Sequence, residues 1–259
     1  MTDFSEVVSG VYRDGDAWTA DVGEDWRRGR TLFGGLSGAL CLEAAKREFI
    51  DLPPLRSAQF ALVGPASGKI MVRLSMLRRG KSTAFISADL LGEDGLATRG
   101  TLGFAAPRPS AYNYAIDAMP EVKTPEQSTP FSRKVNFAQH FDNRLGGGNL
   151  PFSKAADPTM LLWMRHREEA LMPSATALVA LADAPPPAAQ VLFDQQAPVS
   201  TMTWAFDMLT DDFETEDGWW LVRVSAESVL GGYSSQAMTV WNSSGKRVLV
   251  GHQNYAVFG

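Results

Sequence analysis

Cysteine is almost absent from this chain of 259 residues, which contains only Cys41. A single thiol excludes an internal disulfide, a CxxC redox pair and a cysteine-rich zinc site. The three histidines, His140, His166 and His252, lack the short spacings of metal-binding motifs. No G-x-S-x-G nucleophile motif is present, which argues against an α/β-hydrolase esterase. The sequence therefore predicts no bound metal and no redox cofactor.

Long apolar runs and an excess of positive charge are also missing. No window approaches the roughly 18 consecutive apolar residues that a membrane-spanning helix needs. Residues 1–10 have neither the basic nor the apolar region of a signal peptide. The formal net charge of -5 argues against a nucleic-acid-binding surface. We therefore expect a cytoplasmic protein whose partner is a small molecule, not a membrane or a nucleic acid.

Hydrophobic residues make up 45% of the chain, and the first clear pattern among them is a helical spacing after residue 33. Small and branched apolar residues recur at helical spacing from Leu36 to Ala45, directly after two glycines. The prolines in DLPPL, residues 51–55, cannot continue a helix. This pattern predicts a buried helix over residues 33–49.

Strand-like runs follow this helix, separated by glycine-containing breaks that suit tight antiparallel turns. They cover residues 57–64, 69–80, 82–92 and 96–106. In this order they predict a four-stranded antiparallel meander. The next segment, residues 107–134, holds five of the 15 prolines and no clear period, so we interpret it as a linker.

The remaining sequence repeats this order of elements. Strands are predicted over 135–144 and 158–168, with the glycines at 146–148 as a loop, and a helix over 173–184. Further strands are predicted over 200–209, 218–230, 233–242 and 247–258. Matches such as Arg73 with Arg223 and Ser75 with Ser225 place the two halves 150 residues apart.

A buried helix followed by an antiparallel sheet, present twice, predicts an α+β protein of the double-hotdog type. Each sheet must curl around its helix to bury one face. Joining the two sheets edge to edge into one continuous sheet removes an exposed edge from each. The expected organisation is a first hotdog repeat at 1–106, a linker at 107–134 and a second repeat at 135–259.

Several segments resemble acyl-CoA thioesterases of the double-hotdog, thioesterase II-like family. They are FGGLSGAL at the first helix, the strand region that follows it from 57 to 90, MLLWMR, the helix end ALADA and the final GHQNYAVF. The resemblance implies hydrolysis of an acyl-CoA to a free acid and coenzyme A. In that family an aspartate after the second helix, a hydroxyl on the next strand and a glutamine on the last strand hold the attacking water.

The resemblance carries these three roles to Asp183, Thr201 and Gln253. For the hydroxyl, Ser200 and Thr203 stay open as alternatives. Strand alternation places Thr203 on the same face as Thr201, and Ser200 on the other. This strand departs from many relatives, and the departure keeps a second hypothesis open, a non-catalytic acyl-CoA or acyl-chain binding protein. A hotdog dehydratase is disfavoured because neither predicted helix contains a histidine.

The residues themselves support a site at these positions. An aspartate at a helix end, like Asp183, is electrostatically unfavourable near the negative end of the helix dipole and needs a reason. Alternation turns Gln253 to the same inward face as Tyr255, where its amide must find partners. Gly34 and Gly35 let a substrate carbonyl approach the positive end of the first helix, so we predict that they bind the substrate.

Two further expectations follow from comparing the halves and their surfaces. Gly103 stands at the position of Gln253 and Ser57 at that of Thr201, which predicts one composite site per chain. In the run at 218–230, neighbouring tryptophans face opposite sides of the strand, so one would lie on the outside. We expect a homo-oligomer that covers this face.

Overall fold

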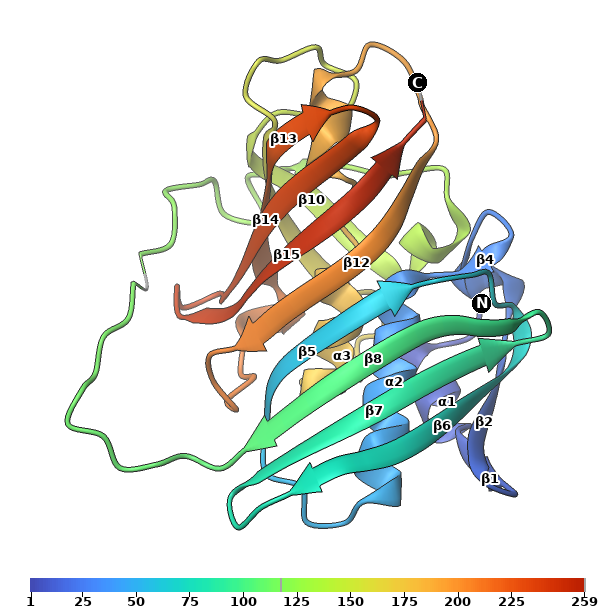
Figure 1. Ribbon diagram of the computed structural model, residues 1–259. Helices are drawn as coiled ribbons and strands as arrows, with labels where there is room; N and C mark the ends of the chain where they lie inside the picture. Colours follow the sequence, from blue (N-terminus) through green and yellow to red (C-terminus); the bar gives the residue numbers. More distant parts are fainter. Residues whose placement is uncertain (117, 259) are drawn as a thin grey trace.

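One continuous antiparallel sheet runs through the protein and curls around two helices (Figure 1). The computed structural model describes residues 1–116 and 118–258. Within this part of the chain the sheet has 13 strands in the order β1-β2-β6-β7-β8-β5-β12-β15-β14-β13-β11-β10-β9. No helix in this part is long and apolar enough to cross a membrane.

The first half contains the long helix and the strands that wrap it. Its elements are α1 (Phe4–Ser9), β1 (Tyr12–Asp14), β2 (Ala17–Val22), the 3-10 turn η1 (Glu24–Trp26), β3 (Arg27–Arg28), β4 (Thr31–Leu32), α2 (Gly34–Glu48), β5 (Leu55–Leu62), β6 (Gly68–Arg79), β7 (Thr83–Gly92) and β8 (Gly95–Ala105). The predicted helix is confirmed, and its apolar residues from Leu36 to Ala45 are buried.

The predicted four-stranded meander is wrong in one strand. β6, β7 and β8 form a meander, but β5 pairs with β8 and not with β6. The other edge of β5 pairs with β12, where Phe60 lies opposite Trp204. Both edges of β5 are therefore hydrogen-bonded, and the two halves become one sheet at this point. Turn chemistry at 63–67 cannot show that a strand pairs with a distant partner.

The second half repeats this arrangement. Its elements are β9 (Thr129–Pro130), η2 (Asn136–His140), β10 (Phe141–Gly148), β11 (Thr159–His166), α3 (Ala175–Ala182), η3 (Ala188–Leu192), β12 (Val199–Met208), η4 (Glu216–Gly218), β13 (Trp220–Leu230), β14 (Tyr233–Asn242) and β15 (Arg247–Val257). Residues 136–140 form a 3-10 turn where a strand was predicted. The glycines at 146–148, predicted as a loop, lie inside β10. A Cβ on Gly146 would come within 3.1 Å of the Trp163 ring, so glycine allows this ring to pack closely on the strand.

The helices α2 and α3 pack against each other inside the curved sheet (Figure 1). Glycine makes this contact close: a Cβ on Gly38 would lie 3.3 Å from Phe60, Trp204 and Val179. Gly38 therefore lies where both helices meet the two central strands. These features confirm the double-hotdog fold.

The segment between the halves covers part of the outer face of the sheet in the second half. Trp163 donates from Nε1 to the Lys123 carbonyl at 2.7 Å, and Met119 and Val122 pack on the cluster that includes Trp219. Trp219 belongs to this outer cluster and Trp220 to the main core, so the two tryptophans face opposite sides as predicted. Trp219 is nevertheless only 4% exposed, so the expectation of an uncovered tryptophan is wrong. The chain covers this ring itself, which local alternation does not show. The domain division at 106 and 134 stays a prediction.

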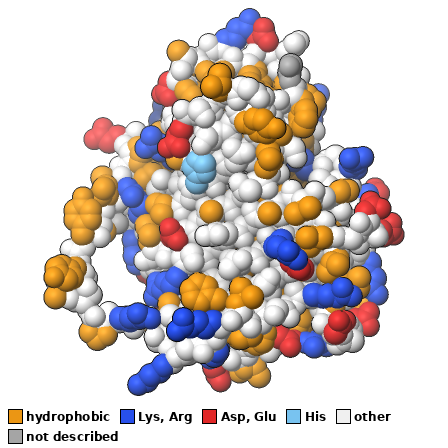
Figure 2. Space-filling view, viewed as in Figure 1, with side chains coloured by type: hydrophobic (Ala, Val, Ile, Leu, Met, Phe, Trp, Pro, Cys, Tyr) orange, Lys and Arg blue, Asp and Glu red, His pale blue; other side chains and the backbone are white. Residues whose placement is uncertain are grey.

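Part of the same segment stands away from the body of the protein. Tyr112 and Tyr114 are 91% and 90% exposed, and the projecting segment carries hydrophobic side chains (Figure 2). The central outer face of the sheet is mostly uncharged in this view, with charged side chains gathered toward its margins (Figure 2).

Candidate active site

A cavity of about 410 Å³ lies where the N-terminus of α2 meets the C-terminus of α3. Of the residues predicted from the sequence, Gly34, Asp183, Thr201 and the alternative Ser200 line it, whereas Gly35 and Gln253 do not. Apolar side chains such as Leu32, Leu62 and Val199 form much of the remaining wall. Arg28 and Arg30 also line the cavity and bring positive charge to it. The cavity therefore has a mixed lining, in which apolar side chains alternate with charged and hydroxyl groups.

Asp183 caps the C-terminus of α3 and turns its carboxylate toward α2. Ser174 is the N-cap of α3, where its hydroxyl accepts from the Ala177 amide, and the last turn of the helix is fully buried. The Gly35 N–H faces the Asp183 carboxylate and acts to lower the pKa of its carboxyl. The positive end of α2 thus faces this carboxylate, which offsets the unfavourable end of its own helix.

Burial determines the titration of Asp183. Desolvation raises the pKa of its carboxyl from 3.8 to about 6, because water no longer stabilises the charged form. The positive charges of Arg28 and Arg133 and the hydrogen bond from Gln253 oppose this rise in pKa. The carboxyl is therefore ionised at pH 7, yet its pKa lies close enough to neutrality for it to accept a proton during a reaction.

Gly34 and Gly35 allow the two helices to meet at Asp183. A Cβ on Gly34 would lie 2.8 Å from Asp183 Oδ2, and one on Gly35 would lie 2.5 Å from the Ala180 carbonyl oxygen. Any larger residue would push the helices apart. Of the two, Gly34 lines the cavity, whereas Gly35 does not and its amide faces Asp183.

A β-bulge at Met202 decides which hydroxyl of β12 faces inward. Thr201 lies opposite Tyr255, and Trp204 opposite Gln253, with a register shift between Thr201 and Thr203. Thr201 therefore faces inward, although simple alternation would place it opposite to Trp204. Thr203 is exposed and does not line the cavity, so the prediction that it shares the face of Thr201 is wrong.

Gln253 is 1% exposed and faces inward beside Tyr255, as its strand alternation predicts. Its Nε2 donates to Asp183 Oδ1 at 2.5 Å. Its Oε1 accepts from the Tyr255 hydroxyl at 2.7 Å and from Gln236 Nε2 at 2.9 Å. Sequence reasoning missed Gln236. The available signal is an amide inside the strand predicted at 233–242, and only the structure shows that it lies directly opposite Gln253.

The predicted correspondence of Gly103 with Gln253 and of Ser57 with Thr201 is wrong. Gly103 and Ser57 pair with each other on the outward face, whereas Gln253 and Thr201 face inward. Gly100 lies opposite Phe60 as Gln253 lies opposite Trp204, and a Cβ on Gly100 would come within 2.7 Å of the Phe60 ring. The first half therefore has no amide at this place, for a steric reason.

At the opposite end of the helix pair lies a second carboxylate, Glu43, which has cationic partners. Thr176 of α3 donates to Glu43 of α2 at 3.4 Å. Arg47 and Lys46 form ion pairs with Glu43 at 2.9 Å and 3.7 Å. Cationic partners thus neutralise Glu43, whereas no such pair within 4 Å is found for Asp183 among the described residues.

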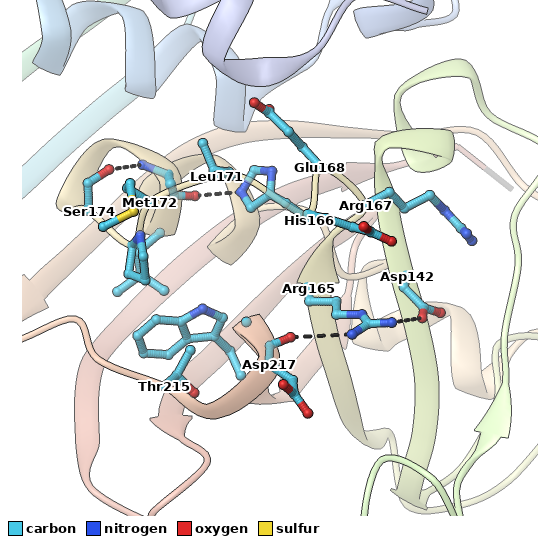
Figure 3. A pocket seen from close by; sticks show the side chains of 16 residues that line it. Asp142, Arg165, His166, Arg167, Glu168, Leu171, Met172, Ser174, Thr215 and Asp217 are labelled. Carbon is cyan, nitrogen blue, oxygen red and sulfur yellow. Dashed lines mark hydrogen bonds and ion pairs between the residues drawn. The ribbon is translucent and has the colours of Figure 1, made fainter.

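A second cavity, of about 530 Å³, lies beside the N-terminus of α3 (Figure 3). Several of its polar side chains already have partners: Arg165 contacts Asp142 at 3.4 Å, and His166 Nε2 lies 3.0 Å from the Ala177 carbonyl oxygen. Burial lowers the pKa of His166 to about 4, so the ring is neutral at pH 7. The predicted site residues do not line this cavity.

No group of three potential metal-binding side chains is found within residues 1–116 and 118–258. The geometry at Asp183 thus consists of a buried carboxylate, two amides, hydroxyls and a helix N-terminus. These groups can hold and deprotonate a water molecule beside a polarised carbonyl.

The fold and this arrangement define a double-hotdog protein with its candidate site between the two helices. Residues 22–105 match the acyl-CoA thioesterase N-terminal domain family, and residues 116–257 match the acyl-CoA thioesterase C-terminal domain family. The chain belongs to this acyl-CoA thioesterase family.

Solved structures share the fold over almost the whole chain. A hot dog fold protein of unknown function from Alicyclobacillus acidocaldarius is 22% identical, with a TM-score of 0.90, and the match covers 100% of this chain and 99% of that one. Acyl-CoA thioesterase II TesB2 from Mycobacterium marinum is 15% identical, with a TM-score of 0.77 and 98% of each chain covered. The tesB protein of Mycobacterium avium subs paratuberculosis is 14% identical, with a TM-score of 0.81, and 99% and 100% are covered. No curated protein matches the sequence.

Proposed function

We propose that the protein hydrolyses acyl-CoA thioesters to a free acid and coenzyme A, at one site per chain. The observation that carries this proposal is the buried Asp183 carboxylate, which lies in a cavity at the N-terminus of α2 and bonds to Gln253. Membership of the acyl-CoA thioesterase family supports the same activity in general.

In the proposed reaction, Asp183, Thr201 and Gln253 hold the attacking water. Asp183 accepts a proton as the water oxygen bonds to the thioester carbonyl carbon. The carbonyl oxygen becomes an oxyanion, which the N-terminus of α2 at Gly34 stabilises. The C–S bond then breaks, and the thiolate of coenzyme A leaves and takes up the proton from Asp183.

The pKa of Asp183 suits this role. A base with a pKa of about 6 is ionised at pH 7, and it accepts a proton more readily than an exposed aspartate. Gln253 donates to the carboxylate and leaves lone pairs on both oxygens for a water molecule. The apolar wall of the cavity offers a surface for part of an acyl group.

The test is release of free thiol from a panel of acyl-CoAs, from acetyl to palmitoyl, read with a thiol-reactive dye. Turnover by the wild type and its loss in Asp183→Asn would support the proposal. If no acyl-CoA is hydrolysed while acyl-CoAs still raise the melting temperature, the protein is a binding protein on the same fold.

We further propose that the chain forms homo-oligomers. Phe85 and Leu77 are exposed on β7 and β6, at 42% and 57%, and a second copy would cover them. Light scattering gives the mass directly: a value near 28.2 kDa at micromolar concentration would contradict self-association. The cytoplasmic location stays a prediction.

A further inference from the structure

The structure assigns a role to Gln236: we propose that it is a positioning residue that holds the Gln253 amide in the orientation in which it donates to Asp183. The inference rests on the proposed function, because Asp183 is the proposed base. It concerns a residue that does not line the cavity and would not touch the substrate.

The orientation of Gln236 follows from a backbone donor. The Ala188 N–H donates to Gln236 Oε1 at 2.6 Å. A backbone N–H can only donate, so it requires the oxygen of Gln236 at this position. The Gln236 amino group must then face the other way, where it lies 2.9 Å from Gln253 Oε1.

The same reasoning extends to Gln253. Its Oε1 accepts from Gln236 and from the Tyr255 hydroxyl, so its amino group faces Asp183. Burial raises the pKa of Tyr255, which keeps its O–H as a donor. The hydrogen bonds from Ala188 to Gln236, from Gln236 to Gln253 and from Gln253 to Asp183 therefore all donate in the same direction, toward the carboxylate. If Gln253 were rotated, its oxygen would face the Asp183 oxygen at 2.5 Å and repel it.

The Ala188 N–H, which fixes the orientation of Gln236, belongs to the loop that also carries Asp183. Pro185–Pro187 have no N–H groups, so Ala188 supplies the first backbone donor after the triproline. This loop is fixed at Asp183 by Gln253 and at Ala188 by Gln236, two amides that lie opposite each other on β15 and β14. Both amides are 1% exposed, so water does not compete for these bonds.

Gln236→Met tests the proposal, since methionine has a similar size but neither donates nor accepts strongly. We expect kcat to fall about tenfold, the effect of losing one positioned hydrogen bond, with little change in KM. We expect the acidic limb of the kcat profile to move to higher pH, because the bond from Gln253 favours ionised Asp183. The other groups acting on Asp183, namely Arg28, Arg133 and Tyr255, stay in place.

A double-mutant cycle separates positioning from a general loss of structure. If Gln236 acts through Gln253, Gln236→Met should change kcat less than twofold in a Gln253→Ala background. Equal losses in both backgrounds, or an unmoved acidic limb, would overturn the proposal. Gln190→Met makes the same change at another buried glutamine and should leave the limb in place. If Gln236→Met does not fold, Gln236→Ala leaves a polar cavity for water and serves instead.

A readout without turnover keeps this inference separate from the proposed function. The difference in unfolding free energy between wild type and Asp183→Asn varies with pH as Asp183 titrates. In the Gln236→Met background we expect the midpoint of this variation to move to higher pH. If the wild type hydrolyses no thioester but the midpoint moves, the positioning role holds and only the catalytic assignment fails. An unmoved midpoint refutes the positioning role itself.

Discussion

Replacement of Asp183 by asparagine should make the protein progressively more stable relative to wild type as pH rises from 4 to 8, while removing most of its activity. The carboxyl is buried at the end of α3, and desolvation raises its pKa to about 6. A carboxyl with a raised pKa in the folded state stabilises that state fully only below the unfolded value, near 3.8. This contribution is lost as pH rises through 6. Asparagine is neutral at every pH, so its contribution to stability does not change as pH rises.

The size of the effect follows from the same values. The difference between 3.8 and about 6, at about 1.36 kcal/mol for each pH unit, corresponds to about 3 kcal/mol. The asparagine NH2 must face one donor, either Gln253 Nε2 or the Gly35 N–H, which costs about 1–3 kcal/mol at every pH. Because pH 4 already lies slightly above 3.8, we expect the stability of Asp183→Asn relative to wild type to increase by about 2 kcal/mol between pH 4 and pH 8.

Urea unfolding of both proteins across this range measures the effect. Asp89→Asn is a control of opposite sign, because the Arg99 guanidinium lowers the pKa of Asp89. Relative to wild type, the Asp89→Asn protein should therefore become slightly less stable as pH rises from 4 toward neutrality. Turnover by Asp183→Asn should fall by about 10²-fold, the usual contribution of a general base. A relative stability that does not change with pH would refute the buried, desolvated carboxylate.

The remaining predictions concern the same site. The acidic limb of kcat/KM should have its midpoint near pH 6, with activity lost below it as Asp183 takes up a proton; a flat profile down to pH 4.5 would exclude this base. Thr201→Val should lower kcat about tenfold, whereas the matched change Thr203→Val should not, because the bulge turns Thr203 outward; equal effects would contradict this. Calorimetric titration with a non-hydrolysable acyl-CoA analogue should give one ligand per chain, because Glu43 at the other end of the helix pair is held in ion pairs with Arg47 and Lys46. Two equivalent ligands per chain would contradict a single site.

Local patterns in the sequence are sufficient for many elements. The helical spacing of apolar residues after Gly34 predicts α2, and the alternation of β15 places Gln253 and Tyr255 on the inward face. These predictions succeed because the periods of helices and strands are properties of a single segment. The repeated order of helix and strands likewise indicates the double-hotdog fold before any contact is known.

Tertiary structure alone decides how those segments combine. The pairing of β5 with β12, the bulge that separates Thr201 from Thr203, and the bonds from Ala188 through Gln236 to Gln253 depend on partners distant in the sequence. Asp183 shows the difference most clearly. Its position at a helix end can be read from the sequence, but its pKa depends on burial and on groups from four other parts of the chain. Burial and electrostatic interaction act through space, so no local pattern contains them.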